Sequence, residues 1–158
     1  MELEEVLRVL DRLDEAGVSL CVGGGWGVDA LLGRPSRDHR DLDLLVDATA
    51  FEEAVETLAA LGYARETDWL PVRLEVAAPG RGWVDLHPVD VDAGGHGVQQ
   101  GPAGTTYEYA AGDRTLGTLG GRPVPCLTRQ AQLRLHAGYD PRPQDRADLA
   151  LLRSLDDD

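Results

Sequence analysis

The chain has 158 residues, 42% of them hydrophobic, and a formal net charge of −13 at pH 7. This length is enough for one domain with a buried core, and no apolar run approaches the roughly 20 residues needed to cross a bilayer. The acidic balance argues against a nucleic-acid partner, because the phosphate backbone requires a basic surface. We therefore expect one domain with neither a nucleic-acid nor a membrane partner.

The N-terminal segment and the cysteines predict the compartment. The segment MELEEVLRVLDRLDEAG is acidic from its second residue and lacks the basic start of a signal peptide. The two cysteines, Cys21 and Cys126, form neither a CxxC pair nor a disulfide framework. These features predict a cytoplasmic protein.

Hydrophobic spacing and turn residues predict alternating helices and strands. In chain order we expect a helix over 2–16, a strand over 20–22, a helical run over 26–32, a strand over 41–46, a helix capped by Thr49 and ended by Gly62, strands around 72–76 and over 83–89, and helices from Thr128 to about 138 and over 144–155. The glycine-rich residues 90–104 are expected to form a loop, and residues 105–109 and 114–119 a hairpin. Residues 156–158 are expected to be disordered.

The stretch of residues 22–46 combines two features typical of a site for phosphate and metal. The glycine run 23–25 precedes the predicted helix, and backbone N–H groups at a helix N-terminus favour an anion such as phosphate. Asp41 and Asp43 are two residues apart on the next predicted strand, so their carboxylates share one face. Neighbouring carboxylates repel each other unless a cation lies between them. The pattern predicts metal-dependent nucleotide chemistry.

A third carboxylate comes from the predicted strand 83–89, where Asp85 shares a face with His87. The alternative is that these acids are merely exposed strand residues. Aspartate is depleted in strands, and two like charges on one face are destabilising, which disfavours this alternative. We predict that Asp41, Asp43 and Asp85 form the metal-binding and catalytic set.

Several motifs resemble a known family. The active-site signature of the aminoglycoside 2″-adenylyltransferase type of nucleotidyltransferase, related to the lincosamide nucleotidyltransferases, is similar to Gly24-Gly25-Trp26, Val28-Asp29, Leu32-Gly33 and Arg37 through Asp43. The likeness continues in the expected order at residues 84–89, 95–99, 124–127, 136–139 and 145–149. The resemblance thus extends over nearly the whole chain.

The resemblance implies the nucleotidyltransferase fold, an α/β (α+β) arrangement in which a short mixed β-sheet is flanked by helices. Within a single domain spanning 1–158, we expect a core over about 1–122 and a small C-terminal helical extension over about 123–155. The family's two metal ligands map onto Asp41 and Asp43, and its third carboxylate maps onto Asp85.

The implied activity is the transfer of AMP from ATP to a hydroxyl of a small-molecule acceptor, with release of pyrophosphate. Two Mg²⁺ ions would be held by Asp41 and Asp43, and Asp85 would also accept the hydroxyl proton. The backbone N–H groups of Gly24 and Gly25 are expected to bind the nucleotide phosphates.

Arg37 or Arg40 is expected to neutralise the pyrophosphate leaving group. His39 is expected to fix this arginine-rich loop. Because carboxylates remain in excess near Asp85, we expect a cationic amino-sugar acceptor, such as an aminoglycoside. The candidate acceptor-binding residues are His87, Asp92 and Tyr139.

Two alternatives stay open at this point. The same fold and site serve equally well in a natural-product biosynthetic step, which the sequence does not separate from antibiotic resistance. A non-catalytic, antitoxin-like binding protein of this fold is the other alternative, although such proteins usually lack a C-terminal module like residues 136–149. The expected assembly is a monomer or a homodimer.

Overall fold

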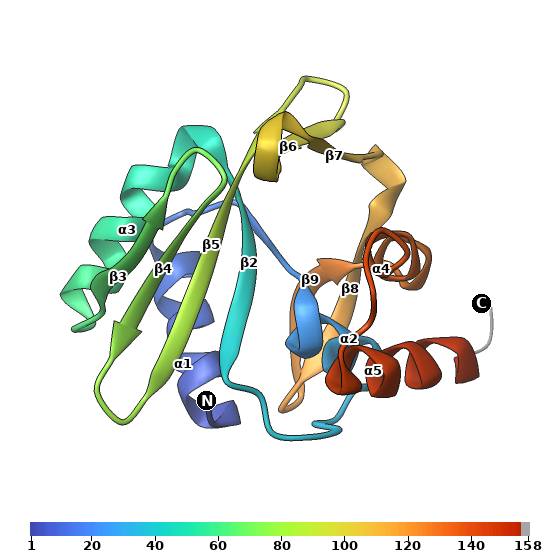
Figure 1. Cartoon of the computed structure of the whole chain (residues 1–158). Helices are drawn as coiled ribbons and strands as arrows, with labels where there is room; N and C mark the ends of the chain where they lie inside the picture. Colours follow the sequence, from blue (N-terminus) through green and yellow to red (C-terminus); the bar gives the residue numbers. More distant parts are fainter. Residues whose placement is uncertain (156–158) are drawn as a thin grey trace.

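The computed structural model describes residues 1–155 and is organised around one mixed β-sheet (Figure 1). Its strands are β1 (Leu20–Val22), β2 (Asp41–Asp47), β3 (Ala64–Trp69), β4 (Arg73–Ala78), β5 (Gly82–Val91), β6 (Gly97–Gln100), β7 (Thr106–Tyr109), β8 (Arg114–Leu119) and β9 (Arg122–Leu127). The spatial order is β3-β4-β5-β2-β1-β9-β8, with β6 paired to β5 and β7 paired to β6. The arrangement is the mixed sheet that the sequence predicts.

Helices flank this sheet at both ends. Among the described residues they are α1 (Leu3–Glu15), α2 (Gly24–Leu32), α3 (Phe51–Ala60), α4 (Arg129–His136) and α5 (Pro143–Ser154). In Figure 1, α1 and α3 lie together behind the half of the sheet that contains β2 to β5, and α2, α4 and α5 lie at the end near β8 and β9. Within residues 1–155, no helix has the length and apolar character that a bilayer crossing requires.

Strand β2 lies in the middle of the sheet, and one of its faces packs on the core. Leu42, Leu44 and Val46 are fully buried and belong to the main core with residues of α1 and α3. Since side chains alternate along a strand, Asp41 and Asp43 point to the opposite face. The core therefore holds the strand so that its acids are presented on the open side of the sheet.

Three strands of the sheet, β3, β6 and β9, were not predicted. β3 is an edge strand with a mostly exposed burial pattern, so it carries no alternation of apolar and polar residues. β6 lies within the predicted loop 90–104, and it begins at Gly97, whose missing side chain lets it pack closely on β5. The exposure of β3 and the glycine of β6 removed the alternation of apolar and polar residues from which a strand is predicted.

The predicted hairpin of residues 105–109 and 114–119 is wrong in its pairing, because β7 pairs with β6 and β8 pairs with β9. The predicted cap at Thr49 is also wrong. A 3₁₀ turn over 48–50 precedes α3, and the Asp47 carboxylate accepts hydrogen bonds from the backbone N–H and hydroxyl of Thr49. Asp47 thus engages the hydroxyl that Thr49 was expected to use as the cap.

The C-terminal helical part begins later than the predicted residue 123, because residues 122–127 form β9. Prolines at 123 and 125 pair in register with β8, and they are tolerated on the other side because the registered pairing with β1 is confined to Val22 and Cys126. The predicted cap at Thr128 is confirmed by the hydrogen bond that its side chain accepts from the Ala131 N–H. Residues 156–158, which were expected to be disordered, lie outside the described residues.

Candidate active site

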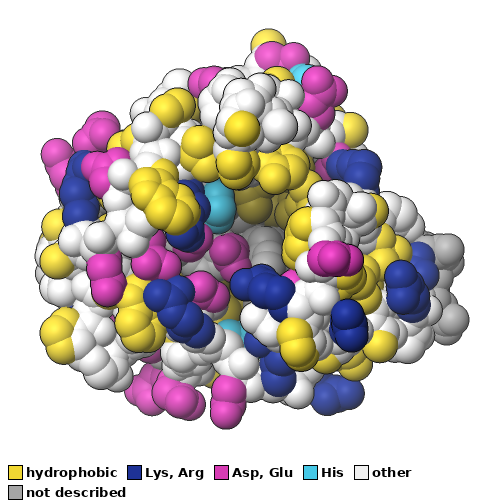
Figure 2. Space-filling view, in the orientation of Figure 1, with side chains coloured by type: hydrophobic (Ala, Val, Ile, Leu, Met, Phe, Trp, Pro, Cys, Tyr) yellow, Lys and Arg dark blue, Asp and Glu magenta, His cyan; other side chains and the backbone are white. Residues whose placement is uncertain are grey.

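A cleft of about 680 Å³ opens on the polar face of the sheet. Figure 2 shows the hollow, with acidic, basic and histidine side chains on its floor and apolar side chains around its mouth. The predicted site residues that line it are Gly24, Gly25, Arg37, Arg40, Asp41, Asp43, Asp85, His87 and Tyr139. Segments far apart in the sequence thus meet in one site, as the motifs predict.

Asp43 and Asp85 are direct neighbours on the parallel strands β2 and β5. Together with His87 they form a cluster whose potential ligand atoms all lie within 4.8 Å of one another. The His87 Nε2 atom is 3.5 Å from Asp43 Oδ1 and 3.8 Å from Asp85 Oδ2. The sequence predicted His87 only as an acceptor-binding residue. Its position on the same strand face as Asp85 was the feature that indicated a place beside the acids.

Asp85 is only 5% exposed, and its Oδ1 atom is buried without a hydrogen-bond partner among the described residues. Its other oxygen, Oδ2, accepts a hydrogen bond from Arg73. Burial raises the pKa of Asp85, and the charge of Asp43 raises it further, against the opposing effects of His87 and Arg73. A buried acceptor without a partner is costly, so this atom is suited to meet a cation or a hydroxyl donor.

Asp41 lies on the same strand as Asp43 but is not one of the three residues of the cluster. Its carboxylate is 3.1 Å from Arg40, which is also 3.0 Å from Glu75. Burial raises the pKa of Asp41, and the neighbouring charge of Asp43 adds to this shift. The predicted repulsion between the two aspartates is therefore present, and Arg40 offsets part of it.

The glycine turn lies directly against this cluster. Gly24 has a φ of +54°, and a Cβ at this position would overlap the Asp43 carboxylate. A Cβ at Gly25 would likewise overlap the ring of His39. Glycine is needed here because no side chain can fit between the N-terminus of α2 and the acids. The turn therefore brings the N-terminal backbone of α2 up to the carboxylates.

A buried aspartate holds the arginine-rich loop that follows α2. Asp29 is fully buried, its Oδ2 is 2.6 Å from His39 Nε2, and its Oδ1 accepts a 3.1 Å hydrogen bond from the Ser36 backbone N–H. Burial alone would raise the pKa of Asp29, but the hydrogen bonds from His39 and Ser36 outweigh it and lower the pKa. The prediction that His39 fixes this loop is confirmed.

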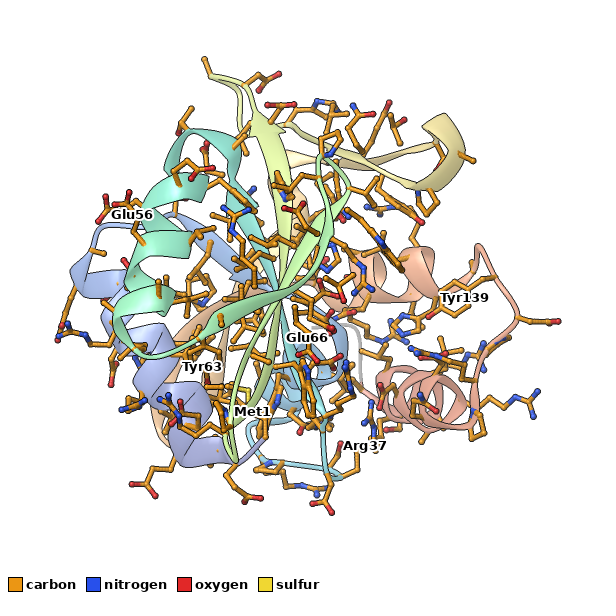
Figure 3. The ribbon with its side chains drawn as sticks, turned by 60° about the vertical axis from the view of Figure 1, so that its left-hand side comes forward. Met1, Arg37, Glu56, Tyr63, Glu66 and Tyr139 are labelled. Atoms are coloured by element: carbon orange, nitrogen blue, oxygen red, sulfur yellow. The ribbon has the colours of Figure 1, made fainter. Side chains whose placement is uncertain are left out.

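Arg37 ties the same loop to the C-terminal helix. Its Nε and Nη2 atoms donate to the two oxygens of Asp148 in α5, at 3.0 and 2.7 Å, and Figure 3 shows Arg37 beside this helix. The hydrogen bond to Asp148 raises the pKa of Arg37 above its usual value. Asp148 was not singled out from the sequence, because no local pattern indicates a partner 111 residues away.

Arg37→Ala is expected to lower the free energy of unfolding by about 3 kcal/mol, because it leaves the buried Asp148 carboxylate unpaired. Urea denaturation measures this change. Arg34→Ala, which removes an exposed arginine from the same loop, is the matched control and is expected to stay within about 0.5 kcal/mol. Equal effects of the two substitutions would contradict a stabilising role for the ion pair.

One predicted acceptor residue lies elsewhere. Asp92 is not among the residues that line the cleft, and its Oδ1 atom accepts hydrogen bonds from the backbone N–H groups of Gly94 and His96 at 2.8 and 3.0 Å. This is the local turn geometry that aspartate favours, so Asp92 orders the β5–β6 turn. Tyr139 does line the cleft, and the residue is 49% exposed.

Acids on two neighbouring strands of a mixed sheet, beside a glycine turn that opens a helix, define a nucleotidyltransferase. A family model described as aminoglycoside-2''-adenylyltransferase matches residues 5–152. The chain belongs to this family and is an antibiotic adenylyltransferase, so its nucleotide substrate is ATP. The predicted family, fold and enzyme class are confirmed, and the alternative of a non-catalytic binding protein is set aside.

Relatives and solved structures agree with this assignment. The chain is 33% identical over 152 residues to the lincosamide resistance protein of Staphylococcus haemolyticus, covering 96% of this chain and 94% of that protein. It is 32% identical over 124 residues to a 2''-aminoglycoside nucleotidyltransferase of Klebsiella pneumoniae, covering 78% of this chain and 66% of that protein.

Among solved structures, the lincomycin-bound lincosamide antibiotic adenylyltransferase LnuA superposes with a TM-score of 0.86 at 33% identity, covering 96% of both chains. The structure of ANT(2")-Ia in complex with adenylyl-2"-tobramycin superposes with a TM-score of 0.76 at 23% identity, covering 95% of this chain and 86% of that one. The second likeness shows the shared fold.

Proposed function

We propose that the protein transfers AMP from ATP to a hydroxyl group of a lincosamide antibiotic and releases pyrophosphate. The observation that supports a lincosamide acceptor is the extent of the match to LnuA, which covers 96% of both chains. The aminoglycoside nucleotidyltransferase of Klebsiella pneumoniae, by contrast, has about a third of its length outside the match. We also propose that the whole chain works as one domain, since α4 and α5 contribute residues to the same cleft as the sheet.

The charges of the cleft support an acceptor with few amino groups. The cleft carboxylates outside the Asp43–Asp85 cluster are already paired with arginines: Asp41 and Glu75 with Arg40, Asp145 with Arg142, and Asp148 with Arg37. The acids that the sequence offers for attracting a cation are Asp68, Glu75, Asp90 and Asp92. Three of them, Asp68, Asp90 and Asp92, lie outside the cleft lining, and Glu75 lines the cleft but is paired with Arg40. We therefore propose an aminoglycoside only as the second candidate for the acceptor, after a lincosamide.

We propose that Asp41, Asp43 and Asp85 hold the Mg²⁺ ions. The unpartnered Oδ1 of Asp85 and the mutual repulsion of Asp41 and Asp43 support this role, and carboxylate oxygens are the ligands that Mg²⁺ prefers. When bound, Mg²⁺ supplies positive charge at the reacting phosphate and the acceptor hydroxyl. His87 offers a nitrogen, a poorer ligand for this metal, so we assign it to positioning.

The nucleotide phosphates are proposed to lie at the N-terminus of α2, against the N–H groups of Gly24 and Gly25. Of the two candidate arginines, Arg40 is better suited to the pyrophosphate, because its side chain is 53% exposed in the cleft. Arg37 is committed to both oxygens of Asp148. We therefore assign leaving-group stabilisation to Arg40 and loop positioning to Arg37.

Asp85 is proposed to accept the proton of the acceptor hydroxyl. Its raised pKa makes it a stronger base than an exposed aspartate. As the proton leaves, the hydroxyl oxygen forms a bond to the α-phosphorus. The bond from that phosphorus to the bridging oxygen breaks, and pyrophosphate departs with the electron pair.

Pyrophosphate release from ATP tests both levels of this proposal, with lincomycin and tobramycin as acceptors. We expect kcat/KM to be at least ~10-fold higher for lincomycin, the effect of about one charge-assisted hydrogen bond. A higher value for tobramycin would overturn the acceptor and leave adenylyl transfer standing. Release with neither acceptor would contradict transfer to these antibiotics.

Ionic strength provides a second test of the acceptor. Because most cleft carboxylates are internally paired, the KM for lincomycin is expected to rise less than twofold between 50 mM and 500 mM salt, where screening removes attraction between separated charges. Steady-state kinetics at the two salt concentrations measures this ratio. A steep rise would show that unpaired acids attract the acceptor, as the sequence alone suggested.

A further inference from the structure

Gln99 and Tyr109, which line the cleft, form a chain of buried polar groups that ends at the Nδ1 atom of His87. The Tyr109 hydroxyl donates to Gln99 Oε1 at 2.7 Å, and the Gln99 amide nitrogen is 3.3 Å from His87 Nδ1. Gln99 is 7% exposed and Tyr109 is 3% exposed. The chain therefore leads from β7, through β6, to the histidine beside the catalytic carboxylates.

The strand register explains how these side chains meet. Gln99 pairs with Val89, and side chains two residues apart on a strand share a face, so Gln99 lies on the same face as His87. Tyr109 pairs with Gly97 on the other side of β6. A Cβ at Gly97 would lie 2.8 Å from the Val89 side chain and 3.6 Å from that of Tyr109. The glycine thus lets β6 lie close to β5 and leaves room for Tyr109.

Burial of an amide and a phenol is unfavourable unless both are hydrogen-bonded, and apolar side chains of similar size would fill the same space without this requirement. The hydrogen bonds instead hold one nitrogen of the His87 ring. With Nδ1 held by Gln99, the other nitrogen, Nε2, faces Asp43 Oδ1 at 3.5 Å and Asp85 Oδ2 at 3.8 Å. The orientation of the ring is therefore set at its Nδ1 atom.

We propose that Gln99, itself held by Tyr109, is a positioning residue that fixes the ring of His87 against Asp43 and Asp85. The β6–β7 hairpin is then part of the active centre and not a peripheral loop. This inference rests on the proposed function, since the fixed ring serves adenylyl transfer by aligning the two carboxylates. Without the amide, the ring is free to rotate about its Cβ–Cγ bond, and the alignment is lost.

Gln99→Leu, of similar size, removes the amide, and Gln100→Leu is the matched control because Gln100 is the exposed neighbour on β6, outside the cleft. We expect Gln99→Leu to lower kcat roughly 10-fold, the low end for loss of a group that orients a metal-site side chain, with a smaller change in the KM for ATP. The control is expected to match the wild type. In a His87→Ala background, Gln99→Leu should have no further effect on kcat.

A second readout needs no turnover. The chain has four histidines, so their ring signals are separable by NMR in the metal-free protein. One sharp set of His87 ring signals is expected in the wild type and in Gln100→Leu, and a broadened or doubled set in Gln99→Leu. Tyr109→Phe removes a single hydroxyl and is expected to broaden the same signals. It serves as the test variant if Gln99→Leu does not fold.

Unchanged His87 signals in Gln99→Leu or, if that variant does not fold, in Tyr109→Phe would overturn the inference. So would an equal loss of kcat from Gln99→Leu with and without His87. Failure of the proposed function looks different, because the wild-type protein would then transfer no AMP while its His87 signals would still respond to Gln99→Leu.

Discussion

Asp43→Asn is expected to reduce adenylyl transfer at least ~10³-fold, which corresponds to losing the several kcal/mol that a bound metal contributes to the transition state. Asp43 lies between Asp41 on its own strand and Asp85 on the next, so it is the acid shared by both pairs. Pyrophosphate release under saturating ATP and Mg²⁺ measures the loss. Mg²⁺-dependent ATP binding, followed by calorimetry, is expected to weaken in parallel.

The same substitution is expected to leave the metal-free protein at least as thermally stable as the wild type. The charge of Asp43 raises the pKa of both Asp41 and Asp85, so removing it relieves repulsion in the native state. Asp38→Asn, an exposed site on the neighbouring loop and outside the cleft, serves as the control. Transfer near the wild-type rate in Asp43→Asn would refute the metal assignment.

The acids of the site could be predicted because their arrangement is local. The spacing of Asp41 and Asp43 is read within one strand, and the alternation that places Asp85 opposite the core is read within another. The cross-strand pairing of Asp43 with Asp85 then follows once the two strands are parallel neighbours. Period-two alternation alone therefore assigns these side chains to the open face of the sheet.

Contacts between distant segments could not be predicted in the same way. Nothing in the local pattern of Arg37 indicates Asp148, and Gln99 lies in a glycine-rich stretch that was expected to form a loop. Asp92 shows the opposite error. It follows Asp85 by seven residues, which on an extended strand is roughly 20 Å. Its closeness in sequence suggested a place in the site, but the strand carries it away from the site.

Asp85→Asn separates the chemical step from nucleotide binding. The substitution keeps an oxygen for the hydrogen bond from Arg73, so the local packing is expected to persist, but it removes the group that accepts the hydroxyl proton. We expect kcat to fall at least ~10²-fold, the low end for loss of a general base, with a smaller change in ATP affinity. Single-turnover AMP transfer and equilibrium ATP binding give the two values separately.

Asp90→Asn is the matched control for Asp85→Asn, because Asp90 is an exposed acid on the same strand and lies outside the cleft. Its kcat and ATP affinity are expected to equal those of the wild type, which shows that loss of one negative charge from β5 does not by itself slow transfer. If Asp85→Asn weakens ATP binding as strongly as it lowers kcat, Asp85 acts only by holding the metal. The proton must then pass to another acceptor, and Asp43, which is paired with Asp85 on the adjacent strand, is the candidate.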